Sequence, residues 1–310
     1  MPPSARSCAP ILVFALPDDP FAAALRARAE QQGLPLWQPA DLAEVGWAVT
    51  LDGDGADVRL IDRKRGCIWP SDTLAGIWFQ ALPPLATIDR LEERDRQYVI
   101  AEVRSSLIPV WRSAACPVIG QPRSDPAAEV LGTGPEARIA LSRLGLPAAK
   151  MTVGRERMVR QAQQGQCVRI TSLTNGESFW LDGFNGAQDR PPVIERSTAI
   201  ASEHRAVRVL VIAGQDLRTV DVRDAGAVSG AEPTAEDATL AARIRAVTGL
   251  ELVLAFCSRQ EGAWRITRLS AQVPWWLAEV PGMASWIGSW LVGRFVPGSR
   301  HAAAVSGGDG

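Results

Sequence analysis

Histidine and lysine are scarce in this 310-residue chain, and their scarcity limits the chemistry that it can support. There are two histidines, and one of them, His301, lies in residues 297–310, a Gly/Ala/Ser-rich tail that we expect to be disordered. A histidine-rich zinc site is therefore excluded, and any Ser-His-Asp or Cys-His mechanism has to use the other histidine, His204. Only Lys64 and Lys150 among the 33 Lys and Arg residues are lysines, which restricts mechanisms that need an ammonium group at a fixed place.

Net charge, long apolar runs and paired cysteines are also lacking. A formal net charge of -1 argues against nucleic acid as an obligate partner, because binding to phosphates needs a surplus of cations. No run approaches the roughly 20 apolar residues of a membrane span, and the apolar segment 11–16 reads as a strand rather than a signal peptide. The five cysteines include no CxxC pair, so we expect free, mostly buried thiols in a reducing cytoplasm.

The apolar segments that are present predict an α/β (α+β) protein with two domains. The first domain, residues 1–125, begins with a buried strand at 11–16 and an alanine-rich helix at 20–32, which Gly33 ends. A Pro/Gly/Ser-rich segment, 121–135, marks its boundary. The other elements expected in this domain are strands at 35–37, 47–51, 58–62 and 76–79 and a long helix at about 88–111.

The second domain, residues 135–296, reads as antiparallel strands with interspersed helices. Its strongest signals are two apolar strands at 206–213 and 217–222, a helix at 234–247, and a strand pair at 251–257 and 263–269. The remaining expected elements are helices at 136–144, 155–164 and 283–295 and strands at 149–153, 167–172, 177–181 and 191–194. Trp286 and Trp290 lie one turn apart on the last helix, where they either complete the core or mark an interface.

Four segments, in this order, resemble the ATP-grasp superfamily, specifically the RimK-like and microviridin-type (graspetide) peptide ligases with a pre-ATP-grasp domain. The segments are Asp95–Glu102 (DRQYVIAE), Arg143–Val153 (RLGLPAAKMTV), Ala206–Gly214 (AVRVLVIAG), and the pair Gly249–Leu252 (GLEL) and Glu261–Pro274 (EGAWRITRLSAQVP). The resemblance covers about residues 10–296. It implies an ATP-grasp-like fold with an N-terminal pre-ATP-grasp α/β domain, and an activity in which ATP activates a carboxylate as an acyl phosphate for coupling to an amine.

The resemblance also implies a magnesium site formed by an Asp, a Glu and an Asn, and this chain departs from it at each position. Phe256 stands in place of the aspartate, Arg268 in place of the glutamate and Ser270 in place of the asparagine. Magnesium requires hard oxygen ligands, and a permanently protonated guanidinium repels a divalent cation. We therefore expect no magnesium site and no required cofactor, while ATP binding stays open.

The phosphate-binding lysines that the resemblance implies are missing as well, although some nucleotide-site positions are retained. The segment 133–135 holds no lysine where the first is expected, and Thr171 or Arg169 falls where the second is expected. Arg169 is nevertheless suited to phosphate, because arginine binds oxyanions as a bidentate donor. Glu195 corresponds to the hinge residue that pairs with adenine, and Arg208 matches the arginine of a family strand, with a structural ion pair as the alternative for Arg208.

Three hypotheses follow. The first is a catalytically degenerate ATP-grasp-like protein that acts as a binding or scaffolding partner in a peptide-modification pathway. The alternative is an ATP-dependent carboxylate-amine ligase with a rearranged, arginine-based phosphate site that uses Arg169, Arg208 and Arg268. The third is a cysteine or serine hydrolase, which rests on His204 alone.

The first hypothesis implies a peptide or protein partner, and it leaves open a homodimer or a complex with an active enzyme. No nucleic acid is expected to bind, and no transmembrane segment is expected. Whether the chain is an enzyme at all depends on which of the first two hypotheses holds.

Overall fold

The chain forms two compact units in the computed structural model, which describes residues 9–52, 55–120, 131, 135–153, 167–172, 178–181, 197–202, 207–223 and 227–296. The first unit is Met1–Ser124 together with Gln272–Gly310, and the second is Asp125–Ala271. The sequence pattern had placed residues up to 296 in the second domain, whereas the segment from Gln272 onward packs in the first unit. The tail expected to be disordered, 297–310, lies outside the described residues.

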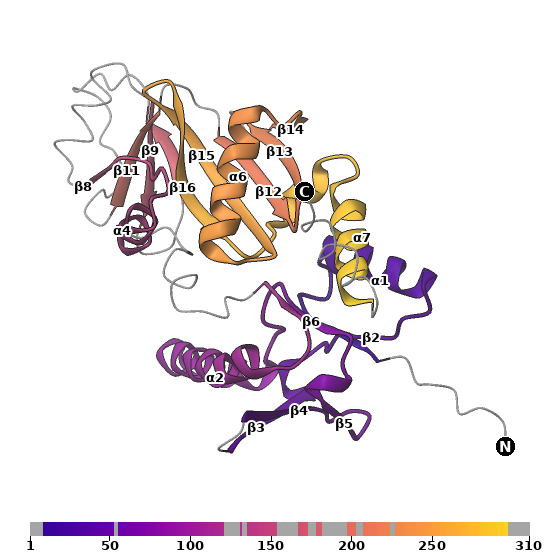
Figure 1. Ribbon diagram of the computed structural model, residues 1–310. Helices are drawn as coiled ribbons and strands as arrows, with labels where there is room; N and C mark the ends of the chain where they lie inside the picture. The colour runs from indigo at the N-terminus through magenta and orange to yellow at the C-terminus, as the bar shows by residue number, and fades with distance from the viewer. Residues whose placement is uncertain are drawn as a thin grey trace. The chain divides into compact units, whose positions relative to one another are not determined.

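A four-stranded parallel sheet with the order β2-β1-β6-β7 forms the centre of the first unit (Figure 1). Its strands are β1 (Ile11–Phe14), β2 (Leu36–Trp37), β6 (Gly76–Phe79) and β7 (Val118–Ile119). All four residues of β1 and of β6 are buried, as is usual for parallel strands that are covered on both faces. The helix α1 (Pro20–Gln31) follows β1, and the Asp19 carboxylate caps it by accepting from the backbone N–H groups of Phe21 and Ala22, both at 2.9 Å.

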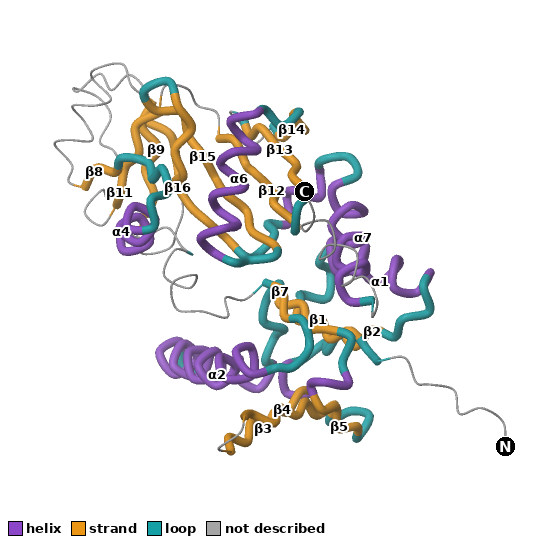
Figure 2. Tube along the Cα trace, viewed as in Figure 1, coloured by secondary structure: helices purple, strands orange, loops and turns teal. Residues whose placement is uncertain are grey.

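An antiparallel hairpin sheet and a long helix complete the N-terminal part of this unit. The sheet consists of β3 (Val45–Asp52), β4 (Gly55–Asp62) and β5 (Cys67–Pro70), and α2 (Glu93–Ser113) packs against β3 and β4 (Figure 2). Trp111 of α2 contacts the rings of Phe14 and Phe79, with ring centroids 5.3 and 5.2 Å away. Short 3-10 helices lie at Leu42–Glu44, Ser71–Thr73 and Ala86–Arg90.

The end of the chain joins the first unit through one side-chain clamp and one helix. The Gln80 side chain accepts from the backbone N–H of Val273 at 2.9 Å and donates to the carbonyl oxygen of the same residue. A 3-10 helix at Trp275–Glu279 and α7 (Met283–Phe295) follow, and α7 packs along α1. Trp286 and Trp290 are half-buried on α7, outside the set of fully buried residues on that helix.

The second unit contains a five-stranded antiparallel sheet with the order β14-β13-β12-β15-β16 and a four-stranded antiparallel sheet with the order β10-β9-β11-β8. The strands of the larger sheet are β12 (Val207–Ala213), β13 (Asp216–Val222), β14 (Val228–Ala231), β15 (Leu252–Gln260) and β16 (Ala263–Ser270). Those of the smaller sheet are β8 (Met151–Val153), β9 (Cys167–Ser172), β10 (Ser178–Leu181) and β11 (Ser197–Ser202). Its described residues include the helices α4 (Pro135–Arg143) and α6 (Ala235–Thr248).

The ends of α6 are set by strong local signals. Thr234 and Asp237 form a reciprocal capping box at its start, and Gly249 ends it in the left-handed conformation with a φ of 61°. Its buried residues Leu240, Ala241 and Ile244 pack against β12 and β15 in one core with residues of α4.

Most expected elements are confirmed, and the exceptions have a common cause. β6, β9 and α7 have the bounds that the sequence predicted, and the remaining strong signals shift by a few residues. β5, β7, β11 and β14 were missed, because each is short or rich in Ser, Thr, Gly and Ala and so lacks an apolar period. The helix expected at 155–164 and the strand expected at 191–194 lie outside the described residues.

The contact between α1 and α7 leads to a stability prediction. A Cβ on Gly288 would lie 2.9–3.0 Å from backbone atoms of Ala24 and Leu25, whereas a Cβ on Gly293 meets nothing within 4 Å. Alanine raises helix propensity by up to about 1 kcal/mol at either site, but overpacking against α1 costs about 1–3 kcal/mol at Gly288 only. We expect Gly288→Ala to lower the free energy of unfolding and Gly293→Ala to leave it unchanged or raise it. Urea unfolding of both variants checks this, and equal effects would contradict the packing of α7 on α1.

Candidate functional site

The two faces of the five-stranded sheet differ in what covers them. Leu210, Ile212, Val253 and Ala255 belong to the core with α4 and α6, and we call their side of the sheet the helix face. Successive side chains of a strand point to opposite faces. Val209, Leu254 and Phe256 therefore point away from α6, and we call this side the far face.

A β-bulge in β16 determines which of its residues reach the far face. Phe256 is opposite Arg268 and Cys257 is opposite Ile266, which leaves Thr267 as one extra residue. Without this insertion Arg268 would share the helix face with Ile266, two residues before it. The Thr267 hydroxyl donates to the Phe256 carbonyl oxygen at 2.9 Å, and Arg138 of α4 donates to the Thr267 carbonyl oxygen at 2.9 Å. The bulge is therefore held by hydrogen bonds from both sides.

The bulge gathers three of the positions singled out in the sequence on the far face. The Arg268 guanidinium carbon lies 5.3 Å from the centroid of the Phe256 ring, a cation–π contact. Ser270 follows on the same strand, opposite Leu254, and is buried. Although part of the Arg268 side chain is exposed, burial of its guanidinium lowers the pKa below its ordinary value, because desolvation disfavours the charged form. The group keeps its proton at neutral pH.

These three side chains do not fit a magnesium ion. They offer an aromatic ring, a guanidinium and a single hydroxyl, whereas magnesium takes several oxygen ligands in octahedral geometry. Within the part of the chain that the structure describes, no cluster of three or more His, Cys, Asp and Glu side chains is arranged to hold a metal.

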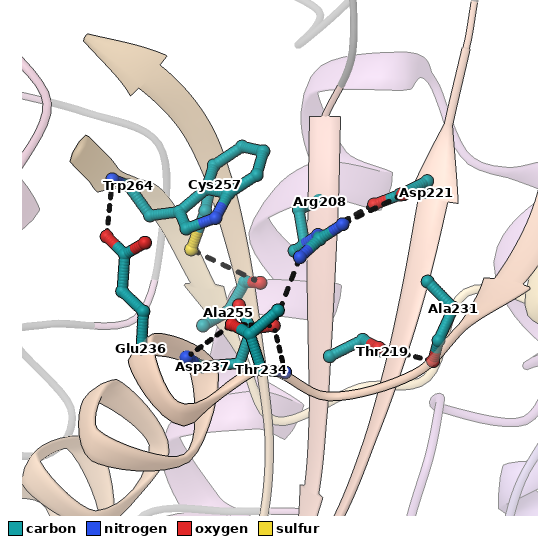
Figure 3. Close-up of polar contacts among 10 residues, drawn as sticks. All are labelled: Arg208, Thr219, Asp221, Ala231, Thr234, Glu236, Asp237, Ala255, Cys257 and Trp264. Atoms are coloured by element: carbon teal, nitrogen blue, oxygen red, sulfur yellow. Dashed lines mark hydrogen bonds and ion pairs between the residues drawn. The ribbon is translucent and has the colours of Figure 1, made fainter. Parts of the chain in front are cut away.

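Arg208 is the remaining nucleotide-site candidate that the structure describes in full. It lies on β12, on the helix face, and reaches Asp237 at the start of α6 (Figure 3). Its guanidinium donates to both Asp221 oxygens at 2.8 and 3.0 Å and to Asp237 Oδ2 at 3.1 Å. Hydrogen bonding to Asp221 is the main reason that the pKa of Arg208 is raised, with attraction from both carboxylates adding to it and burial opposing it. Arg208 thus forms the structural ion pair that was the alternative in the sequence.

The surroundings of Arg208 are closed to bulk water on several sides. Asp237 is 1% exposed and the Trp264 ring lies 4.9 Å from the guanidinium carbon of Arg208. Burial raises the pKa of the neighbouring Cys257 thiol, so this cysteine stays protonated and is a poor nucleophile. Cys67, Cys116 and Cys257 are free thiols, as expected.

Other sequence candidates are placed as follows. Arg169 lies on β9, opposite Trp180 of β10, and its side chain is not among those described. Glu195 and His204 lie outside the described residues. The Lys150 ammonium pairs with the exposed Glu261. The hydrogen bond from Lys150 is the main reason that the pKa of Glu261 is lowered.

The sequence did not reveal the acidic partners of Arg208. Asp221 is opposite Arg208 on the neighbouring strand and Asp237 is 29 residues away, so neither is a local neighbour. The Thr-x-x-Asp spacing of Thr234 and Asp237 is a capping-box signal that marks Asp237 as a helix-start residue. It does not show that the same carboxylate also accepts a hydrogen bond from Arg208.

The Arg208 network leads to a second prediction. Arg208→Met leaves the buried Asp237 carboxylate without its cation, and loss of one partner of a buried pair costs about 3–5 kcal/mol. Lys150→Met, in the same unit, removes a cation from an exposed pair and is expected to cost less than about 1 kcal/mol. Thermal unfolding of both variants measures the difference, and comparable losses would show that Arg208 has no special structural role.

Comparisons with known proteins complete the description of the fold. No family model matches the sequence, and no curated protein matches it. Solved structures do match. A RiPP-associated ATP-grasp ligase of Chryseobacterium gregarium, in complex with ADP and a leader and core peptide, aligns with a TM-score of 0.65 at 11% identity over 92% of this chain and 96% of that chain.

Two further ligases give the same result. The macrocyclase MdnC of Microcystis aeruginosa MRC, bound with the precursor peptide MdnA, has a TM-score of 0.68 at 13% identity, covering 93% of this chain and 99% of that chain. The ATP-grasp ligase PsnB, complexed with a minimal precursor, Mg and ADP, has a TM-score of 0.65 at 16% identity, covering 92% of this chain and 97% of that chain. In the described residues of this chain, no helix combines the length and the apolar character of a membrane span. The protein therefore has the mixed α/β fold of the ATP-grasp ligases, as the resemblance in its sequence implied.

Proposed function

We propose that the protein is a catalytically degenerate ATP-grasp-like protein that acts as a binding or scaffolding partner in a peptide-modification pathway. The observation that carries this proposal is the contact of Arg268 with Phe256. These two residues occupy positions at which the resemblance implies magnesium ligands. A ring and a guanidinium in contact there supply no oxygen ligand, and the guanidinium opposes a divalent cation.

The structural neighbours support a peptide as the partner. Two of them were solved with a precursor or a leader and core peptide, and PsnB with a minimal precursor. We infer that the first unit corresponds to a pre-ATP-grasp domain and the second to the ATP-grasp domain. The whole architecture is retained although the metal ligands are absent from the expected positions, which favours binding over catalysis as the selected property.

A second candidate function is an ATP-dependent carboxylate-amine ligase with an arginine-based phosphate site. It is favoured by the position of Arg268, which offers a fork of donors to a phosphate. Arg208, which this candidate also requires, already bonds to Asp221 and Asp237. The two carboxylates neutralise its charge, so the candidate rests on Arg268 and on Arg169.

The dependence of nucleotide binding on magnesium tests whether the chain lacks the magnesium site that the resemblance implies. We expect the thermal midpoint of the protein in excess ATP to be the same with and without Mg²⁺, to within about 1 °C, because no magnesium site holds the complex together. A control without ATP removes the direct effect of Mg²⁺. A rise of about 5 °C or more that needs both ATP and Mg²⁺ would overturn the degenerate assignment.

Restoring oxygen ligands tests the positions themselves. In the triple variant Phe256→Asp, Arg268→Glu and Ser270→Asn, the three side chains remain on one face of β15 and β16, now with oxygen donors. We expect this variant to bind ADP more tightly with Mg²⁺ than in metal-free buffer, by tenfold or so, whereas the wild type shows no such difference. The variant Arg259→Gln serves as the control, because it changes charge on the helix face of the same strand pair. Failure of the triple variant to gain any Mg²⁺ dependence would contradict the assignment of these positions.

A further inference from the structure

One edge strand of the protein, β3, is both long and uncovered. In the sheets that the structure describes, the edge strands β2, β5, β7, β8, β10 and β14 have at most four residues. β16 is longer, but the segment 147–149 pairs with it: the backbone N–H of Ala149 donates to the Ile266 carbonyl oxygen at 2.8 Å, and that of Ile266 donates to the Pro147 carbonyl oxygen at 2.7 Å. β3 has eight residues, and among the described residues the backbone of 46–51 is hydrogen-bonded to β4 alone.

The sequence of β3 lacks the features that usually protect an edge strand. Residues 45–51 include no charged residue and no proline, and their pairing with β4 runs without a bulge. Natural proteins place such features on exposed edges, because the unpaired N–H and C=O groups of an edge otherwise attract another strand. An uncovered edge of this length therefore indicates a place where a further strand pairs.

The side chains of β3 divide into an apolar face and a face of small residues. Trp47 and Val49 pack against the core of the first unit, and by alternation Leu51 lies on the same side. Leu51 is 75% exposed, the largest fraction among the large apolar side chains of the described residues. Ala48 and Thr50 lie on the other side and are exposed. A partner strand thus has to offer apolar side chains on one face and small, uncharged ones on the other.

We propose that a second copy of the chain is this partner, and that the two β3 strands pair antiparallel about a two-fold axis at Val49. An axis perpendicular to the sheet keeps each face continuous, so residues that lie opposite each other share a face. Trp47 then lies opposite Leu51 of the partner subunit, and Ala48 lies opposite Thr50 of the partner subunit. The pairing covers the exposed Leu51 with an aromatic ring and gives the outward backbone groups hydrogen-bond partners.

This interface is independent of the proposed function. It lies on the hairpin sheet of the first unit, whereas Phe256, Arg268 and Ser270 lie on β15 and β16 of the second. A single strand edge covers less than the roughly 800 Å² per partner of a standard interface, so we expect a dissociation constant on the order of 1–100 µM.

The first test is sedimentation velocity of the full-length protein at concentrations from about 1 to about 500 µM, a range that spans the expected dissociation constant. A reducing agent is present, so that copies joined by a disulfide do not contribute. We expect a reversible equilibrium between monomer and dimer. A protein that is monomeric at every concentration would overturn the proposal.

Charged variants test whether β3 is the surface that pairs. In the double variant Ala48→Lys and Thr50→Lys, lysines of the two copies lie directly opposite each other, and opposed like charges destabilise strand pairing. We expect the dimer to weaken about tenfold or more. The matched control is Ile68→Lys and Ser105→Lys, which adds the same charge at exposed positions of β5 and α2 in the same unit. We expect this control to change the dissociation constant less than about twofold.

A variant of opposite charge tests the register. Ala48→Glu with Thr50→Glu is also expected to lose self-association, but a mixture with the lysine variant places each lysine opposite a glutamate. We expect the mixed dimer to be about tenfold tighter than the dimer of either variant alone. A loss of folding cannot produce this recovery, and the thermal midpoint of each variant is measured first.

Two further results would overturn pairing through β3, even for a wild type that dimerises. One is an equal loss of association in the lysine variant and in its control, which would place the contact elsewhere on the molecule. The other is a mixture of the lysine and glutamate variants that stays monomeric. Neither result bears on the magnesium dependence of nucleotide binding, so the proposed function stands or falls separately.

Discussion

The side chains on the far face depend on one extra residue in β16. With Thr267 inserted, Arg265 and Arg268 fall on the side away from α6, while Ile266 and Leu269 remain in the core. A strictly alternating strand cannot achieve this, because residues three apart point to opposite faces. The hydrogen bonds from Thr267 to Phe256 and from Arg138 to Thr267 fix the insertion. The packing of α4 is therefore linked to the chemistry of the opposite face through Arg138.

Arg208 on the helix face and Arg268 on the far face differ in their partners. On the helix face, Arg208 is compensated by Asp221 and by Asp237, whose carboxylate also caps α6. One buried carboxylate therefore stabilises a helix start and an arginine at once, which makes the cluster a structural unit. On the far face, Arg268 contacts an aromatic ring, and no described carboxylate pairs with it. Only the second arrangement leaves guanidinium donors for a ligand.

The fold was largely readable from the sequence, because α6, α7 and β15 carry strong caps or continuous apolar runs. The site was readable only in part. The resemblance pointed to Phe256, Arg268 and Ser270, but a bulge has no signature in a single strand pattern. The partners of Arg208 lie on other elements. The return of the chain to the first unit was likewise hidden, because Gln80 and Val273 are 193 residues apart and no local pattern links them.

A guanidinium at position 268 has two consequences that cannot be separated. Its charge opposes any divalent cation on the far face, and its donors attract the oxyanions that such a cation would otherwise hold. A ligand site of this kind can lose its metal without losing its affinity for anions, provided that the cation is fixed in place. The contact of Arg268 with the Phe256 ring restricts the guanidinium. A ring and a guanidinium at positions 256 and 268 are therefore compatible with the binding role proposed above.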